Sequence, residues 1–266
     1  MTQIRLGTMG FGYSDWADVF YPDGAKPADY LSFYARQFNT VELDTTFHAT
    51  PPIERVQRWA DVTPPDFRFC VKTPKAITHE GALDLRISEM HAFLTVMRAF
   101  GPKLAVVLIQ LPPSCGIDQF EALERLLKTL PQDVRFAVEF RSASWGQQRT
   151  LDLLRVHRCS LVAAEYVTRP TRIHVTADFL YLRLIGEHER FKQLNHEQID
   201  VEPSLEWWKA ELDRVMRERD IQSVWGFFNN DYSGYAIATC RRFMRRMGLA
   251  VPPQDEDLAG QGRLFG

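Results

Sequence analysis

Eight short apolar or β-branched runs, separated by segments of helical periodicity, are the feature that most restricts the fold of this 266-residue chain. The runs cover residues 4–7, 40–43, 67–71, 104–110, 136–140, 161–164, 179–184 and 224–228. Between the fourth and fifth runs, for example, Phe120, Leu123, Leu127 and Leu130 recur at helical spacing. Such alternation implies a parallel sheet covered by helices, and eight repeats favour a TIM-like (β/α)₈ barrel over an open doubly wound sheet.

The lengths of the connections indicate where a functional site belongs. Connections after strands are long, as at residues 8–26, 44–52, 73–86, 165–178 and 185–203, whereas those after helices are short. Long loops after strands collect at the C-terminal face of a barrel, where active sites of this fold lie. We therefore predict one barrel domain over residues 1–248, followed by a flexible tail, 249–266, with prolines and an acidic cluster.

Composition excludes several classes of protein. The 32 basic and 34 acidic residues give a net charge of -2, so no strong overall field attracts nucleic acid or an anionic membrane. The four cysteines lie far apart and show no zinc-ligand spacing, which favours reduced thiols. The N-terminus does not resemble a signal peptide, and the longest apolar run is too short to span a bilayer. We expect a cytoplasmic protein.

Polar side chains stand at the end of almost every predicted strand. Because side chains alternate along a strand, Glu139 and Arg141 point the same way, and an inward-facing Glu42 would join them. The set as a whole comprises Thr8, Glu42, Asp44, Lys72, Gln110, Glu139, Arg141, Glu165, Arg183, Asn229, Asn230 and Asp231. Each member alone is more simply explained as an inter-strand salt bridge or hydrogen bond. The set favours a site that holds an anion with its cations and uses a carboxylate for proton transfer.

Aromatic and histidine side chains lie on the same loops: Trp16, Phe47, His79 and Trp145. Aromatic rings beside hydrogen-bonding groups suit a flat polar ligand, although Trp16 and its neighbours are equally expected to pack a lid onto the barrel rim. The cations near the predicted carboxylates would compete with a metal ion, so we expect neither a resident metal nor a cofactor. The basic stretch Arg241 to Arg246 in the last predicted helix is expected to be a solvated face.

Several segments together resemble the YecE-like family, domain of unknown function 72. They include Gly7-Thr8-Met9-Gly10-Phe11, Val41-Glu42-Leu43, Ile77-Thr78-His79, Ala137 to Arg141 and Phe228 to Asp231. The resemblance implies a TIM-like barrel but no activity. It also implies that the family's recurrent polar positions fall on Glu42, Lys72, His79, Gln110, Glu139, Arg141, Arg183, Asn229 and Asn230. Asp44 stands where the family usually has Asn, and Ile185 where it often has His.

The C-terminal residues contain a second motif. Gln261, Leu264 and Phe265 resemble the QxxLF pentapeptide by which bacterial replication and repair proteins dock on the sliding clamp. A tail that offers Leu and Phe to apolar pockets is a sound mode of recognition. The alternative is that Leu264 and Phe265 dock onto the protein's own barrel.

The leading hypothesis is an enzyme, a hydrolase, lyase or isomerase, acting on a phosphorylated or nucleotide-like anion. Lys72, Arg141 and Arg183 would hold the anion, and Glu42 and Glu139 would be acid and base. Gln110 and Asn229 would orient the substrate, with Thr8, Phe47, Trp145 and Asn230 lining the site and with Trp16 and His79 closing the lid. The alternatives are a phosphodiester-cleaving DNA-repair nuclease docked on the clamp, and a non-catalytic nucleic-acid or clamp-associated adaptor.

Overall fold

Parallel strands arranged in two sheets form the centre of the computed structural model, which describes residues 2–17, 19–81 and 83–252. One sheet has the order β1-β9-β8-β7 and the other β2-β3-β4-β5-β6. The strands are β1 (Gln3–Thr8), β2 (Thr40–Leu43), β3 (Arg68–Lys72), β4 (Leu104–Leu111), β5 (Arg135–Phe140), β6 (Ser160–Leu161), β7 (Ala163–Glu165), β8 (Phe179–Leu184) and β9 (Ser223–Phe228). All of their pairings are parallel, so the predicted α/β class is confirmed.

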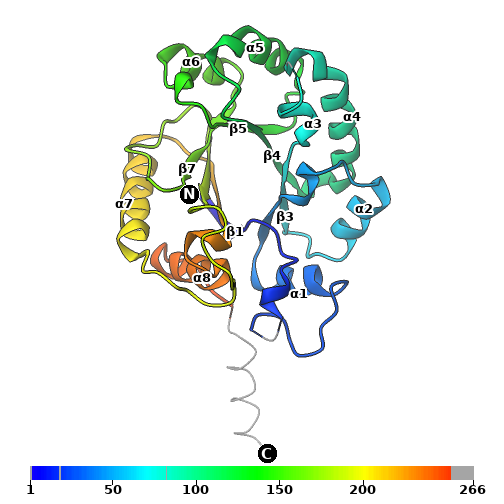
Figure 1. Cartoon of the computed structure of the whole chain (residues 1–266), viewed down its shortest axis with the longest axis vertical. Coiled ribbons are helices and arrows are strands. Elements are labelled where there is room, and N and C mark those ends of the chain that lie inside the picture. Colours follow the sequence, from blue (N-terminus) through cyan, green and yellow to red (C-terminus); the bar gives the residue numbers. More distant parts are fainter. Residues whose placement is uncertain (1, 18, 82, 253–266) are drawn as a thin grey trace, which may run out of the picture.

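The two sheets curve toward each other around a common axis, with the helices outside them (Figure 1). At one seam the chain crosses from β6 to β7 through Val162, whose N–H donates to the Val138 carbonyl at 2.9 Å. At the other seam, the Gly10 N–H donates to the Glu42 carbonyl at 2.8 Å. Within the described residues the strand ladder does not run continuously across either seam, so the sheet is not closed by regular pairing.

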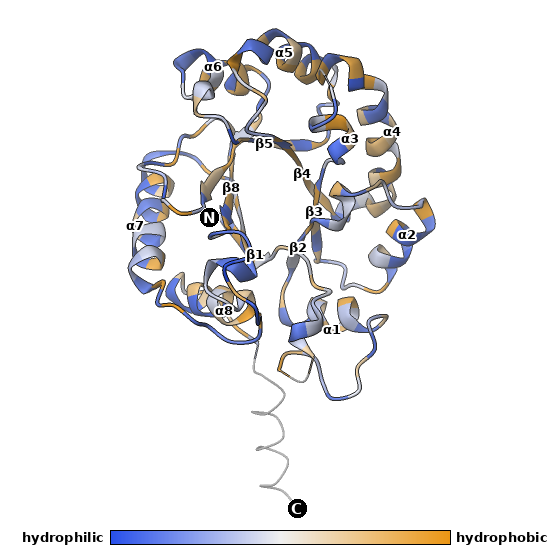
Figure 2. Ribbon diagram, viewed as in Figure 1, coloured by the Kyte–Doolittle hydropathy of each residue, from blue (hydrophilic) through white to orange (hydrophobic). Residues whose placement is uncertain are grey.

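Helices cover the outer side of both sheets. They are α1 (Tyr30–Gln37), α2 (Ile53–Asp61), α3 (Lys75–Thr78), α4 (Ile87–Met97), α5 (Phe120–Thr129), α6 (Gln148–Val156), α7 (Glu202–Glu218) and α8 (Ala236–Arg246). In α5 the apolar stripe predicted from the sequence is buried at Leu123, Leu126 and Leu127. Figure 2 shows apolar residues concentrated in strands such as β4, which is why the polar strand ends stand out from their surroundings.

The alternation of strand and helix fails at one place. The predicted sixth strand, residues 161–164, is divided in two at Val162, and the segment from 166 to 178 contains no helix. This segment includes Val167, Thr168, Pro170 and Thr171; Pro lacks the N–H that a helix needs, and β-branched residues have low helix propensity. The expectation of regular alternation throughout the chain is therefore wrong here.

The basic stretch in α8 is only partly the solvated face predicted from the sequence: Arg245 is exposed, but the other three arginines are paired. The Arg241 side chain is buried and donates to Gln37 Oε1 at 2.6 Å. Arg242 pairs with Glu197 and Glu202, and Arg246 pairs with Glu202 of α7. Arg241 ties α8 to α1, and Arg242 and Arg246 tie it to α7 and to the loop before α7. Among the described helices none is long and apolar enough to cross a membrane.

Candidate functional site

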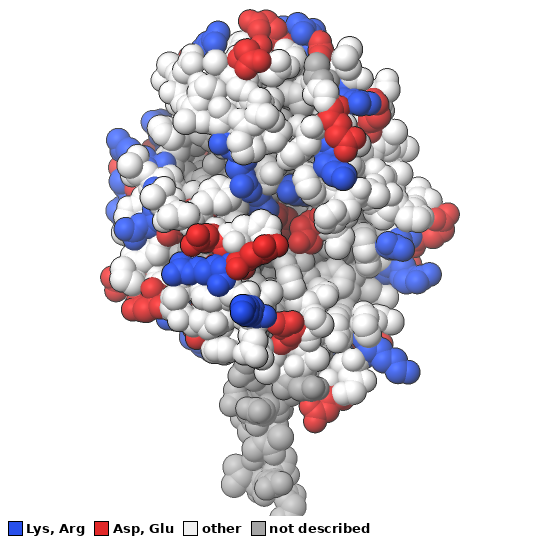
Figure 3. Space-filling view, viewed as in Figure 1, with Lys and Arg blue, Asp and Glu red and all other residues white. Residues whose placement is uncertain are grey.

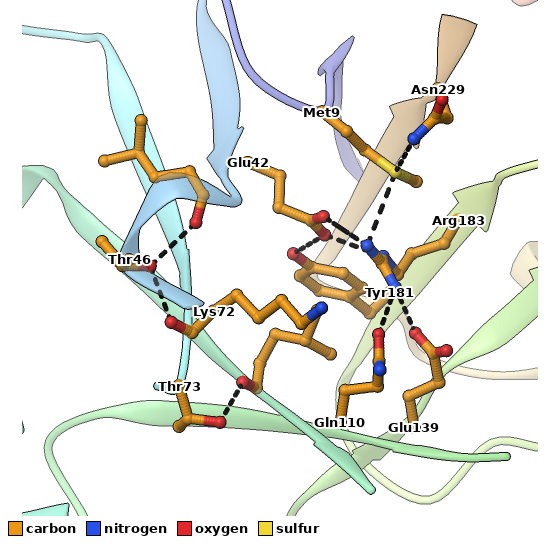
Figure 4. Close-up of polar contacts among 12 residues, drawn as sticks. Met9, Glu42, Thr46, Lys72, Thr73, Gln110, Glu139, Tyr181, Arg183 and Asn229 are labelled. Carbon is orange, nitrogen blue, oxygen red and sulfur yellow. Dashed lines mark hydrogen bonds and ion pairs between the residues drawn. The ribbon is translucent and has the colours of Figure 1, made fainter. Parts of the chain in front are cut away.

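Arg183 is the centre of a buried polar cluster inside the ring of strands. It lies on β8 in one sheet, and its guanidinium bonds to carboxylates of the opposite sheet (Figure 4). Nη2 donates to Glu42 Oε1 at 2.8 Å, and Nη1 donates to Glu139 Oε2 at 2.6 Å and to Gln110 Oε1 at 3.1 Å. The predicted convergence of strand-end side chains from β2, β4, β5 and β8 is therefore observed.

Tyrosine hydroxyls and a second arginine complete the bonding of the two carboxylates. Tyr181 donates to Glu42 Oε2 at 2.7 Å, and Tyr166 donates to Glu139 Oε1. Arg141 Nε also donates to Glu139 Oε1, at 2.5 Å, as the parity of β5 predicts. Both carboxylates are almost fully buried, and burying a charge without such partners would be costly.

The neighbouring charges keep Glu139 and Arg183 in their charged forms. Burial by itself would raise the pKa of Glu139, but Arg183 and Arg141 lower it to about 2. Burial likewise favours neutral Arg183, yet Glu42 and Glu139 raise the pKa of that guanidinium well above its ordinary value. A carboxylate with so low a pKa cannot donate a proton near pH 7 and is a weak base. The low pKa does not support the prediction that Glu139 acts as acid or base, and in the structure Glu139 is an ion-pair partner of Arg183.

Lys72 differs from Glu42, Glu139 and Arg183 because no anionic partner for it is found among residues 2–17, 19–81 and 83–252. Its side chain, at the end of β3, points toward the cluster in Figure 4, and its residue is 9% exposed. Within the described residues, its ammonium group makes no ion pair or hydrogen bond. It lies 3.7 Å from the centroid of the Phe47 ring. Burial and the nearby Arg183 lower the pKa of Lys72 to about 8.

Local structure explains why Phe47 lies over Lys72. Thr46, in the loop after β2, places its hydroxyl 2.9 Å from the Leu43 carbonyl oxygen and 2.6 Å from that of Lys72. These contacts tie the loop to the end of β3. The next residue, Phe47, then contacts both the Lys72 ammonium and the ring of His79, whose centroid is 4.9 Å away.

Two partly exposed groups beside Lys72 have shifted pKa values. Burial and the neighbouring Glu42 raise the pKa of Asp44, although Lys72 counteracts part of the shift. Burial, Lys72 and Arg141 lower the pKa of His79, whose Nδ1 lies 2.8 Å from the Thr78 hydroxyl. Asp44 and His79 thus differ from Glu42 and Glu139, which are both bonded to arginine. Charged side chains of both signs gather around the hollow at the centre of Figure 3.

Several predicted site residues have structural roles instead. Thr8 is fully buried and bonds to the Tyr34 hydroxyl, because its side chain packs toward α1. Trp145 stacks on Phe140, with ring centroids 4.4 Å apart, and donates to a loop carbonyl. The structure thus places Thr8 and Trp145 outside the cluster.

Trp16 of the predicted lid is buried against the rim of the fold and is not available to a ligand. Trp16 is fully buried and donates its indole N–H to Asn230 Oδ1 at 3.2 Å. The same Asn230 oxygen accepts the Ala236 N–H at the start of α8. Asn229 reaches the edge of the cluster, where Nδ2 lies 3.7 Å from Met9 Sδ. The alternative explanation for Trp16, as rim packing, is therefore the better one.

Sequence reasoning missed the tyrosines. Tyr181 lies two residues before Arg183 on β8, so strand parity could have placed it in the cluster. Tyr166 lies in the helix-free segment after β7 and carried no such signal. Its ring centroid lies 3.9 Å from Cζ of the Arg141 guanidinium. Gln261, Leu264 and Phe265 lie outside the described residues.

Comparisons with known proteins agree with the sequence resemblance. The model of the family "Protein of unknown function DUF72" matches residues 5–260. The UPF0759 protein YecE of Escherichia coli (strain K12) is 40% identical over 111 residues, which span 42% of this chain and 41% of YecE. The UPF0759 protein YunF of Bacillus subtilis is 26% identical over 96% of this chain and 99% of YunF.

Solved structures show the same arrangement. A DUF72 family protein from Thermotoga maritima has a TM-score of 0.77 at 27% identity, over 92% of this chain and 99% of that one. Another DUF72 family protein, from Enterococcus faecalis, has a TM-score of 0.72 at 21% identity. This match covers 94% of this chain and 99% of that one. The second likeness concerns the fold alone.

Proposed function

This chain belongs to the DUF72 family, and from that premise we propose that it is an enzyme acting on an anionic small molecule, phosphorylated or nucleotide-like. We further propose that its two sheets act as one (β/α)₈-like barrel, with the substrate bound where the strands end. Ligands of parallel α/β folds bind at that end of the strands.

The observation that carries this proposal is that the ammonium group of Lys72 has no partner in the part of the chain that the structure describes. Arg183 is satisfied by Glu42 and Glu139, so it serves the structure of the site rather than ligand binding. Arg141 is more exposed, with a side-chain exposure of 28%, and its Nη1 makes no hydrogen bond within the described residues. Among the cations of the described cluster, Lys72 and Arg141 thus keep donors for an anion. A partly buried ammonium gains more from an anion than an exposed one does.

Proton transfer in this proposal falls to Asp44 and His79 rather than to the two glutamates. Burial raises the pKa of Asp44 and lowers that of His79, so the imidazole is a neutral base at pH 7. Gln110 holds Arg141 and Arg183 through one oxygen, Oε1, and so sets the distance between them. In this proposal Gln110 orients the two arginines directly, and it acts on the position of the substrate only through Arg141.

Calorimetric titration of the protein with inorganic phosphate tests the proposal. We expect saturable binding that weakens at least about tenfold in Lys72→Met, because the variant loses a partly desolvated charge. Lys75→Met is the matched control, since Lys75 is exposed three residues further along and should leave binding unchanged. Absence of binding to phosphate and to a nucleoside monophosphate, or equal binding by Lys72→Met, would reject the anion site.

Docking on the bacterial sliding clamp stays a separate proposal that depends on Gln261, Leu264 and Phe265. We expect deletion of residues 261–266 to abolish capture by immobilised clamp, and unchanged capture would remove the main reason for a role in DNA repair. No observation in the described residues favours a phosphodiester-cleaving nuclease or an adaptor over an enzyme of small anions.

A further inference from the structure

Lys72 combines properties that few buried lysines share. Buried lysines are normally paired with a carboxylate, yet both carboxylates of this cluster are already bonded to Arg183. The apolar face of Phe47 covers the ammonium group on one side. An amine held in this way keeps its lone pair available whenever it loses its proton.

The groups around Lys72 make that loss of a proton accessible near neutral pH. Burial and the positive charges of Arg183 and Arg141 outweigh Glu42 and Glu139, which gives Lys72 a pKa of about 8. Asp44 and His79 are the other titratable groups whose charges interact with it. At pH 7 about a tenth of such a lysine is the neutral amine, which is the nucleophilic form.

We propose that Lys72 is the nucleophile of this site and forms an imine with an aldehyde or ketone carbon of an anionic substrate. The inference rests on the proposed anion site and narrows its substrates to carbonyl compounds that carry a phosphate or carboxylate. Arg141 holds the anionic group, and the Phe47 ring limits the approach of the carbonyl to the open side of the amine.

The chemistry balances without an external oxidant or reductant. The nitrogen lone pair forms the C–N bond while the carbonyl π electrons move to oxygen, which takes a proton and gives a carbinolamine. The nitrogen then loses a proton, the hydroxyl gains one, and water leaves as the C=N bond forms. The protonated imine finally releases its remaining N–H proton to a neighbouring group. Asp44 and His79 are the neighbouring groups that carry these protons. The net change is amine plus carbonyl to imine plus water.

Borohydride trapping on the full-length protein tests the inference. Glyoxylate is the small anionic probe and pyridoxal 5′-phosphate the phosphorylated one; borohydride reduces an imine to a stable secondary amine, and peptide mass spectrometry locates it. We expect Lys72 to be labelled at least about tenfold faster than exposed Lys75 at pH 7, because burial and Arg183 lower the pKa of Lys72. In Lys72→Arg the fast label should vanish while Lys75 labelling stays unchanged.

Inorganic phosphate separates the two proposals. If both hold, phosphate slows the labelling of Lys72 and not that of Lys75. If phosphate binds in a Lys72-dependent way but neither probe labels Lys72 faster than Lys75, the imine inference is overturned and the anion site stands. Fast labelling of Lys72 that phosphate does not slow, and that pyridoxal without its phosphate matches, would support the nucleophile and reject the anion site.

Discussion

At the scale of single residues, the structure separates two kinds of charge in the site. Glu42, Glu139 and Arg183 are bonded to one another, and the pKa of Glu139 is lowered while that of Arg183 is raised. Lys72 has no such partner among the described residues, and its burial is a cost that folding must overcome. Residues that lower stability in this way are characteristic of functional sites.

The cost of burying Lys72 predicts an unusual dependence of stability on pH. The folded-state pKa, about 8, lies below the ordinary value of 10.5, so between these values the unfolded chain binds more protons. Stability from this group therefore rises as pH increases from about 8 to 10.5, and below pH 8 the full cost is present. We expect Lys72→Met to be more stable than the parent at pH 7, on the order of 1 kcal/mol after allowance for solvent screening.

Urea unfolding at pH 7, 8, 9 and 10 measures this effect. The advantage of Lys72→Met should shrink as the pH rises, whereas Lys75→Met should follow the parent at every pH. A Lys72→Met protein that is less stable than the parent at pH 7 would show that the ammonium group has a partner which stabilises the fold.

At the scale of elements, the loops after the strands are held by close backbone contacts. Gly186, just after β8, has φ +77°, and a Cβ at this position would lie 2.2 Å from the Asp231 carbonyl oxygen in the loop after β9. Only glycine allows these two loops to approach so closely. The approach fixes the loops next to Arg183 and Asn229 at the carboxyl ends of adjacent strands.

Substitution of Gly186 should therefore be far more costly than substitution of another glycine with a similar backbone angle. Gly24 has φ +72°, but a Cβ added there would meet nothing within 4 Å, so Gly24→Ala isolates the backbone strain alone. We expect about 1 kcal/mol of destabilisation for Gly24→Ala and about 3 kcal/mol or more for Gly186→Ala. Denaturant unfolding measures both, and equal losses would contradict the close approach.

At the scale of the whole molecule, the polar cluster is also what joins the two sheets from the inside. Arg183 and Tyr181 belong to the sheet β1-β9-β8-β7, whereas Glu42, Gln110 and Glu139 belong to β2-β3-β4-β5-β6. Regular strand pairing does not cross either seam in the described residues, so these side-chain bonds carry part of the connection. The site and the stability of the barrel-like assembly are thus coupled.

Removal of Arg183 should weaken the whole fold. Arg183→Met leaves two buried carboxylates without their shared cation, and breaking a buried pair in this way costs about 3–5 kcal/mol. Arg98→Met, which removes an exposed ion pair with Asp133, is the control and should have little effect. Amide hydrogen exchange should show faster opening of both sheets in Arg183→Met; faster exchange in β8 alone would contradict the role in joining them.

The sequence by itself determined the alternation of elements outside residues 161–178, the bounds of most strands and the strand ends at which charges converge. These features are local, because they follow from periodicities of 2 and 3.6 residues and from the alternation of side chains along a strand. The parity of β5 alone was enough to place Arg141 beside Glu139.

Only the tertiary structure decided which of those charges are satisfied. Glu42 and Glu139 looked like an acid and a base until Arg183 was seen to bond both across the molecule, 141 and 44 residues away in the chain. Lys72 looked like one cation among three until both carboxylates of the cluster proved to be bonded to Arg183. Which charged groups pair depends on the distances between segments that are remote in the sequence. These distances also contribute to the pKa shifts of Glu139, Arg183 and Lys72, and no local sequence pattern encodes them.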